Sequence, residues 1–226
     1  MDDVDWVVEL AARRRERIVE FAPRFWNPAP GALDTHAGFL AGLVQSPTTL
    51  ALRTDHGFVI AVPGHDRLVI DDMALEDDSL WPTEGDALLR RAATGTPLRV
   101  VCPLPEPARR TAVTRLGLSV AETWWHRDLD PDPTWDGHND DAPLAVDGAD
   151  AILVPAPPVY APGGPVVLVR AVASVSALRA VEQAASRRGS TVSVVSQQPD
   201  NRSAADMLES AGYKRTTEFF EGTATS

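Results

Sequence analysis

Two adjacent carboxylates are the side chains best suited to chemistry. Asp71 and Asp72 stand side by side in RLVIDDMALED, residues 67–77, among apolar neighbours. Alternation along a strand sends them to opposite faces, so one carboxyl points toward an interior or a cleft. A carboxylate there is costly unless it is paired or wetted, and desolvation raises its pKa toward the range of a general base. The alternative is an ion pair with an arginine such as Arg53 or Arg67.

Cysteine and histidine offer less. The single cysteine, Cys102, ends the apolar stretch VVCPL and is typical of a small core residue. It allows no internal disulfide, and a nucleophile there would need a base partner that the sequence does not locate. The five histidines have no metal-ligand spacing, so no metal site is predicted. His126 follows the Trp124–Trp125 pair and is placed to edge a pocket.

Composition limits the class of protein. The chain has 226 residues, 44% hydrophobic and 23% charged, which is ordinary for one large or two small globular domains. The net charge of −11 argues against a nucleic-acid or anionic-membrane partner, and an anionic ligand would need a local positive site. No apolar run approaches the roughly 20 residues that span a bilayer, and the acidic start is unlike a signal peptide. We expect a cytoplasmic protein.

Periodicity predicts the order of elements in the first part of the chain. Helical spacing marks 4–22 and 33–44, and turn residues separate the strands that follow. The other expected elements are a hairpin at 48–62, a strand at 67–75, a helix at 82–92, a strand at 98–104, a helix at 107–117 and a strand at 118–129.

The later part of the chain is separated by a stretch rich in Asp and Pro. We therefore expect three regions: a module at 1–128, a linker at 129–149 and a shorter module at 150–226. A long loop within one domain is the alternative. The expected elements after the linker are strands at 151–160 and 164–172, a helix at 177–189, a strand at 190–197, a helix at 203–212 and a strand at 213–222.

The two modules end alike. Gly117 and Gly212 each close a helix, an offset of 212 − 117 = 95 residues. At that offset Trp124–Trp125 meets Phe219–Phe220, and each half reads strand, loop, helix, Gly, strand, aromatic pair. Gly is favoured where a helix ends in left-handed geometry. The pattern predicts an internal repeat; two ordinary helix–Gly–strand units are the alternative.

This arrangement resembles the GNAT superfamily of N-acetyltransferases. The matching residues before and after the last Gly are Asn201, Ala204, Met207, Gly212 and Tyr213. The resemblance covers most of 1–128, with two leading helices, and in shortened form 150–222. It implies an α/β (α+β) fold with a mixed central sheet flanked by helices, built as two tandem modules.

The resemblance also implies a reaction, the transfer of an acetyl group from acetyl-CoA to an amine. In such folds the pantetheine lies where two central parallel strands splay, and the diphosphate binds N–H groups at a helix N-terminus. The residues implied to contact the cofactor are Met73, Ala74 and Leu75 on the strand and Thr83, Glu84, Gly85 and Asp86 at the helix start.

The phosphate loop matches only in part. Gly85 corresponds to the last glycine of the family's loop, Thr83 replaces an earlier one, and Thr83 with Asp86 makes a predicted capping box. Five carboxylates compete with a diphosphate there: Glu76, Asp77, Asp78, Glu84 and Asp86. Arg90 and Arg91 offset some of this charge; a capped helix beside a solvated acidic loop is the alternative. The corresponding stretch 171–185 has no glycine, so we expect coenzyme A in the first module.

The same resemblance assigns the base and leaves the acid open. Asp72 is the preferred base, followed by Asp71, because Asp71 is expected to share a face with Val69 and Met73. The family's acid tyrosine falls on Val113 in one half and on Leu208 in the other, and neither can donate a proton.

Two functions follow. The first is an N-acetyltransferase acting on a small-molecule or peptide amine, with an acidic surface suited to a cationic one such as a polyamine, an aminoglycoside or a lysine side chain. The second is a catalytically degenerate binding or assembly protein. A homodimer or an intramolecular pseudo-dimer is expected in either case.

Overall fold

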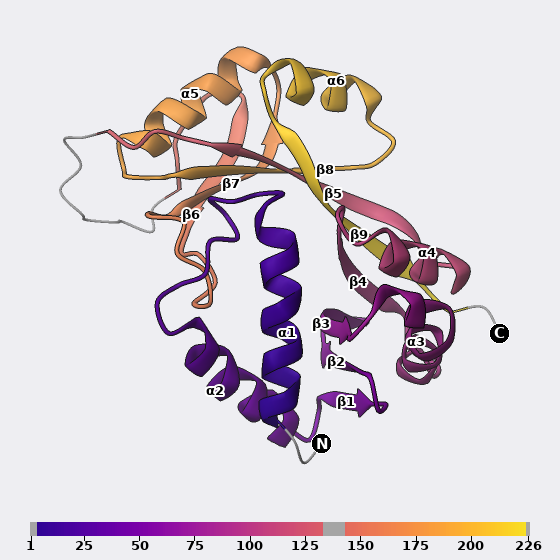
Figure 1. The fold of residues 1–226 in the computed structure, drawn as a ribbon. Helices are drawn as coiled ribbons and strands as arrows, with labels where there is room; N and C mark the ends of the chain where they lie inside the picture. The colour runs from indigo at the N-terminus through magenta and orange to yellow at the C-terminus, as the bar shows by residue number, and fades with distance from the viewer. Residues whose placement is uncertain (1–3, 133–142, 225–226) are drawn as a thin grey trace. The chain divides into compact units, whose positions relative to one another are not determined.

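The structure, a computed structural model, describes residues 4–132 and 143–224. Contacts divide these residues into two compact units (Figure 1). The N-terminal unit takes in 4–18, 31–121 and 217–224. The C-terminal unit takes in 19–30, 122–132 and 143–216. The units interleave along the chain, whereas the modules expected from the sequence are continuous. Residues 133–142 of the expected linker lie outside the described residues.

The N-terminal unit is a mixed sheet between two pairs of helices. Its helices are α1 (Val4–Val19), α2 (Ala32–Gln45), α3 (Asp86–Ala92) and α4 (Pro107–Arg115). Its strands are β1 (Leu50–Arg53), β2 (Gly57–Pro63), β3 (Leu68–Leu75), β4 (Leu98–Pro103) and the end of β9 (Lys214–Gly222). The pair β3–β4 is parallel; β1–β2, β2–β3 and β4–β9 are antiparallel.

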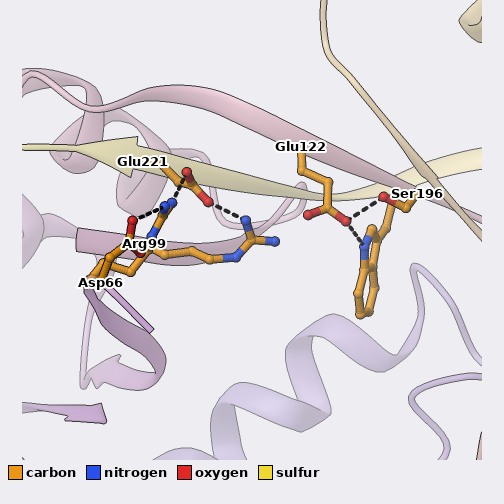
Figure 2. Close-up of polar contacts among 7 residues, drawn as sticks. Asp66, Arg99, Glu122, Ser196 and Glu221 are labelled. Carbon is orange, nitrogen blue, oxygen red and sulfur yellow. Dashed lines mark hydrogen bonds and ion pairs between the residues drawn. The ribbon is translucent and has the colours of Figure 1, made fainter. Parts of the chain in front are cut away.

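Apolar side chains on both faces of this sheet explain its helix layers. Phe58, Ile60 and Ala74 pack against α1 and α2 on one face. Val59 and Met73 pack with α3 and α4 on the other. Because both faces are covered, the strands are apolar with little polar alternation. Glu221 of β9 bonds to Arg67 and Arg99 (Figure 2), which ties the last strand to its neighbours.

A β-bulge interrupts β3 at the two aspartates. Val59 of β2 pairs with Met73, but Ala61 pairs with Ile70, so Asp71 and Asp72 together oppose one residue of β2. The extra residue makes Ile70 and Met73 face the same apolar cluster. The strict alternation expected across this strand is therefore wrong at the bulge. Beyond it β3 leaves β4, with which only Leu68–Ile70 pair.

The C-terminal unit repeats the strand arrangement with one helix layer. Its strands are the second part of β5 (Ser119–Asp128), β6 (Ala149–Val154), β7 (Val166–Val172), β8 (Val192–Gln197) and the start of β9. Its helices are α5 (Val175–Ser186) and α6 (Arg202–Ser210), which pack on the face that carries Trp125. The pair β7–β8 is parallel; β5–β8 and β6–β7 are antiparallel.

A second bulge lies on β7. Asp150 pairs with Ala171 and Ala151 pairs with Val169, so Arg170 is the extra residue. The parallel pairs of β7 and β8 end at Val169. In each unit the parallel pair thus ends where a bulge begins on the earlier of its two strands.

The two helix ends expected to match have the same bonds. Gly117 and Gly212 take positive φ angles of 91° and 81°. Leu118 donates its N–H to the Val113 carbonyl at 3.2 Å, and Tyr213 donates to Leu208 at 2.9 Å. Both helices therefore end in a Schellman-type turn.

The expected mixed sheet flanked by helices is confirmed, with some changed boundaries. The first helix ends at Val19, and β6 stops at Val154 rather than continuing to 160. The prolines that follow Val154 explain this, because proline cannot donate to a strand ladder. No helix in the described parts of the chain is long and apolar enough to cross a membrane.

Replacing Phe220 by Ala tests whether β9 completes the N-terminal unit. Phe220 pairs with Val100 and is 4% exposed within the core cluster of that unit. We expect the substitution to lower the free energy of unfolding by about 3–5 kcal/mol, measured by urea denaturation. Phe21→Ala, at a ring that is 40% exposed, is the control and should cost less than about 1 kcal/mol. A loss for Phe220→Ala as small as the control's would contradict this pairing.

Candidate functional site: two clefts between splayed strands

A buried arginine fills the separation between β3 and β4. Arg109 of α4 is fully buried. Its Nη1 donates to the Met73 carbonyl at 3.0 Å and its Nη2 to the Asp71 carbonyl at 3.1 Å. These carbonyls belong to the part of β3 that has left β4, so the guanidinium takes the place of the missing strand partner.

Charges around Arg109 balance it. Glu106 lies 3.5 Å from Arg109 and accepts a bidentate pair from Arg14, at 2.8 and 2.9 Å. Burial raises the pKa of Glu106, but the charges of Arg14 and Arg109 outweigh this and hold it below its usual range. Burial, with Arg14 nearby, lowers the pKa of Arg109. Removing one member of this network would leave a buried charge unpaired.

The predicted cofactor residues of the first module do not form a phosphate cradle. Met73, Ala74 and Leu75 are buried in the core. Short 3₁₀ and π segments, Asp78–Leu80 and Trp81–Gly85, run directly into α3, so the predicted helix start lies inside a continuous helical stretch.

The helix start is instead capped upstream. Asp77 accepts from the Ser79 N–H at 2.7 Å. Thr83 donates its hydroxyl to the Leu80 carbonyl at 3.2 Å, so the predicted capping box of Thr83 with Asp86 is wrong.

The remaining predicted positions are also engaged or buried. Asp86 pairs with Arg115 at 2.9 Å. A Cβ on Gly85 would lie 2.6 Å from the Trp81 ring, so this glycine makes room for a core side chain and not for a phosphate. Glu84 has one carboxylate oxygen that is buried without a partner among the described residues. These contacts are made within the protein, and the cofactor role of the residues at the start of α3 stays a prediction.

Asp72 and Asp71 have different surroundings. Asp72 Oδ1 lies 3.2 Å from His36 Nε2, and Arg15 contacts His36 Nδ1. A guanidinium only donates, so Nδ1 is the acceptor and Nε2 donates to Asp72. Asp71 keeps an exposed side chain, yet protein atoms crowd its carboxyl. This crowding and the charge of Asp72 raise the pKa of Asp71, against the effect of Arg14.

The partners suggested for the aspartates are engaged elsewhere. Arg67 pairs with Asp66 and Glu221, and Arg53 lies over the Trp6 ring at 4.9 Å from its centroid.

The corresponding separation in the C-terminal unit is an open cleft of about 240 Å³. It lies between the ends of β7 and β8 and the first turns of α6. Its lining residues are Arg170, Ala171, Val172, Val195, Ser196, Gln197, Gln198, Asn201, Ala204, Met207 and Leu208.

The offset of 95 residues explains why one cleft is filled and the other is open. Glu106 precedes α4 as its N-cap residue, and Asn201 is the N-cap of α6, where its side chain accepts from the Ala204 N–H at 3.1 Å. Arg109 stands at the place of Ala204. A methyl group therefore replaces the buried guanidinium, and its volume is left free.

Ser196, a lining residue of this cleft, is hydrogen-bonded to the Glu122 carboxylate (Figure 2). Ser196 Oγ donates to Glu122 Oε1 at 2.6 Å, and Trp124 Nε1 donates to the same oxygen at 2.6 Å. Thr123 pairs with Gln197 on the neighbouring strand, so Glu122 lies beside the end of β8. Sequence reasoning missed Glu122, because nothing in SVAETWW marks its partner in β8.

A buried tyrosine has a structural role in the same unit. The Tyr213 hydroxyl lies 2.8 Å from the Glu182 carboxylate and 2.7 Å from the Ser193 hydroxyl. Because it has one hydrogen, it donates to the carboxylate and accepts from Ser193. Burial, then the charge of Glu182, raises its pKa. Arg127 and Arg179 also bind Glu182, which satisfies the buried carboxylate.

His126 lies apart from this cleft among aromatic rings. It is 5% exposed, and neither ring nitrogen has a hydrogen-bond partner among the described residues. Its ring centroid is 4.4 Å from that of Phe25 and 6.4 Å from that of Trp124. Burial lowers the pKa of His126 to about 3, so the imidazole is neutral in the folded protein near neutral pH. An unsatisfied buried polar group costs about 1–3 kcal/mol.

Comparison with known proteins identifies the fold. No family model matches the sequence, and no curated protein matches it either. A GCN5-related N-acetyltransferase from Sphaerobacter thermophilus superposes with a TM-score of 0.55 at 11% identity, covering 97% of this chain and 92% of that one.

Two further solved structures are similar. A protein from Thermoplasma acidophilum assigned as an acetyltransferase gives a TM-score of 0.54 at 12% identity, covering 86% of this chain and 85% of that one. Another so assigned, from Pyrococcus horikoshii, gives 0.53 at 12% identity, covering 99% and 87%. The chain has the GCN5-related N-acetyltransferase, or GNAT, fold.

Replacing His126 by Phe tests the buried neutral imidazole. The unfolded chain binds a proton at His126 below a pKa of 6.5, while the folded chain binds it only near a pKa of about 3. Stability is therefore lost as the pH falls through this window, by up to about 1.4 kcal/mol per pH unit. We expect the free energy of unfolding of His126→Phe to decrease less on acidification than that of the wild type. The difference in slope should be up to about 1.4 kcal/mol per pH unit.

Urea denaturation at a series of pH values measures how the free energy of unfolding changes with pH in the wild type and in His126→Phe. His65→Gln removes a histidine from an exposed turn and should keep the wild-type slope. Equal slopes for wild type and His126→Phe would contradict the buried neutral state.

Proposed function

We propose that the chain is an acyl-CoA-dependent N-acetyltransferase of the GNAT type, with its cofactor site in the C-terminal unit. The observation that carries this proposal is the open cleft between β7 and β8, where Ala204 stands at the place of Arg109. The motif residues Asn201, Ala204 and Met207, on which the resemblance rests, line this cleft. We do not place the reaction at Asp72 or Asp71, because Arg109 fills the neighbouring cleft.

The residues at the C-terminal cleft fit a thioester cofactor. Ala171 and Val172 belong to the part of β7 beyond its parallel pairs, which leaves backbone groups for an extended amide chain. The first turn of α5 carries no acidic side chain, and Ser174 caps it by accepting from the Ala177 N–H. The N-terminus of this 12-residue helix suits a diphosphate, unlike the acidic start of α3. Acetyl-CoA, when bound, supplies the activated acyl group.

Ser196 and Glu122 are the proposed proton acceptors. Ser196 lines the cleft and already donates its hydroxyl proton to Glu122. Ser196 takes a proton from the attacking amine as it passes its own to Glu122, so the carboxylate is the final base. The net charge of −11 favours a cationic amine as acceptor, in a small molecule or a peptide.

For the N-terminal unit we propose a structural role. Its cleft is closed by the pair of Arg14 and Glu106 and by the bonds of Arg109 to β3. It acts as a non-catalytic copy, in which Arg109 binds the backbone carbonyls of β3 that have no strand partner.

Ala204→Arg tests the location of the cofactor site. The substitution places in the second cleft the side chain that fills the first, and we expect at least about a tenfold loss of acetyl-CoA affinity, measured by calorimetry. Ser203→Arg adds the same charge at an exposed position of α6 and is the matched control. No heat from wild type at millimolar acetyl-CoA would refute the cofactor, and unchanged affinity in Ala204→Arg would refute the site.

Glu122→Gln tests the base. We expect the rate of acetyl transfer to spermidine, followed by release of the free thiol, to fall by about 100-fold, because the amide cannot accept the proton. Acetyl-CoA affinity should stay within about threefold of wild type, since Glu122 acts on the amine and not on the cofactor. Asp72→Asn is the control and should keep the wild-type rate. The reverse result would return the base to Asp72.

A further inference from the structure

An arginine supplies the charge of the open cleft in the C-terminal unit. The residues that line this cleft of about 240 Å³ all belong to the described part of the chain, and one of them, Arg170, has an ionisable side chain. The other polar lining residues are neutral serine, glutamine and asparagine. In a chain of net charge −11, this cleft therefore has the local positive group that an anionic part of a ligand needs.

The backbone of β7 places Arg170 at the cleft. Arg170 is the extra residue of the bulge on β7, at the point where β7 leaves β8. A bulge leaves its extra residue outside the strand ladder and re-aims that side chain, often beside a functional site. In the N-terminal unit the bulge residues are the acidic Asp71 and Asp72. The two units therefore carry opposite charges at their bulges.

The ion pair that Arg170 makes within the chain leaves it able to bind a ligand. Asp150 of β6 accepts a hydrogen bond from Arg170 Nη2 at 2.7 Å, and both side chains are 53% exposed. Exposed ion pairs of this kind contribute little to stability, because water competes with them and salt screens them. A guanidinium has five N–H donors in a planar fork. It can therefore bind a ligand carboxylate beside Asp150 or in its place.

The same cleft holds the side chain that receives the amine proton in the proposed function. Ser196 and Arg170 both line it, so one small ligand that carries an amine and a carboxylate reaches both. A polyamine such as spermidine has a second ammonium group instead of a carboxylate, and Arg170 repels that group. We therefore expect a polyamine to be a slower acceptor than an amine with a carboxylate.

We propose that the acceptor is an amino acid or another amine with a carboxylate, and that Arg170 binds this carboxylate while the amine faces Ser196; this inference rests on the proposed function. The nitrogen of the free amine forms a bond to the acetyl carbon as the carbon–sulfur bond breaks. Its proton passes through Ser196 to Glu122, and the thiolate leaves with the electron pair of the broken bond. Arg170 selects the acceptor and takes no part in these bond changes.

Lysine and cadaverine are a matched pair of acceptors, because they differ only in the carboxylate. Lysine has amines at two distances from its carboxylate, so the pair presupposes neither distance. Cadaverine has the higher positive charge, so the field of this acidic protein favours it, and a local cation is needed to reverse the order. We expect kcat/KM for lysine to exceed that for cadaverine by about tenfold, measured by release of free thiol.

Arg170→Gln tests the residue. We expect KM for lysine to rise about tenfold with little change in kcat, because the carboxylate is bound equally in the ground and transition states. KM for cadaverine should not rise, because the substitution removes a repulsion. Arg187→Gln removes the same charge at the exposed end of α5 and is the matched control, which should keep the wild-type preference. Asp150→Asn removes the competing carboxylate and should not raise KM for lysine.

A binding measurement separates recognition from turnover. The chain is labelled with ¹⁵N at arginine and titrated in the presence of coenzyme A instead of acetyl-CoA, so that no transfer occurs. We expect lysine to shift the Nε resonance of Arg170 saturably and cadaverine to leave it unchanged. The spectrum of Arg170→Gln identifies this resonance.

Four outcomes would overturn the proposal. Equal kcat/KM for lysine and cadaverine, with transfer to both, would refute the carboxylate site and leave the proposed function standing. A preference for succinyl-CoA over acetyl-CoA that Arg170→Gln removes would assign the carboxylate to the acyl group. Weaker acetyl-CoA binding in Arg170→Gln, with an unchanged preference for lysine, would assign Arg170 to the cofactor. Transfer to neither amine would refute the proposed function and this inference with it.

Discussion

Two parallel strands that separate leave backbone groups without partners, and both units are organised around this constraint. A β-bulge starts the separation in each, at Asp71–Asp72 on β3 and at Arg170 on β7. Buried carbonyls must be satisfied or reached by another molecule. In the N-terminal unit Arg109 satisfies them from α4, and in the C-terminal unit the space stays open. One position on one helix, Arg109 or Ala204, thus decides whether the space beside the separated strands is filled.

The buried arginine also explains the charges around it. A guanidinium in the core needs counter-charge, which Glu106 supplies, and Arg14 then shares that carboxylate. These residues come from α1 and from the start of α4, so the network joins two helix layers across the sheet. In the C-terminal unit Asn201 stands in the place of Glu106 as N-cap residue, and the methyl group of Ala204 needs no counter-charge.

The sequence allowed most of the fold to be predicted, because helices and strands follow local periodicity and the glycines at 117 and 212 mark helix ends. The site could not be predicted in the same way. Asp71 and Asp72 drew attention as adjacent carboxylates, but a bulge changed their faces and a distant arginine closed the cleft beside them. Glu122 has no local signal, since its partner Ser196 lies on another strand. The capping box predicted at Thr83 is absent, because the helical stretch begins further upstream, where Asp77 caps it. All of these depend on contacts between residues far apart in the chain.

The pairing of β9 with β4 has a consequence for the order of folding during synthesis. β4 ends at Pro103, but the residues that cover its free edge begin at Thr217. Until the ribosome has released that stretch, the first sheet has an uncovered edge able to pair with other chains. Its closure is a contact of very high sequence separation, which forms late. The sheet of the N-terminal unit can therefore be completed only after the residues of β9 have been synthesised.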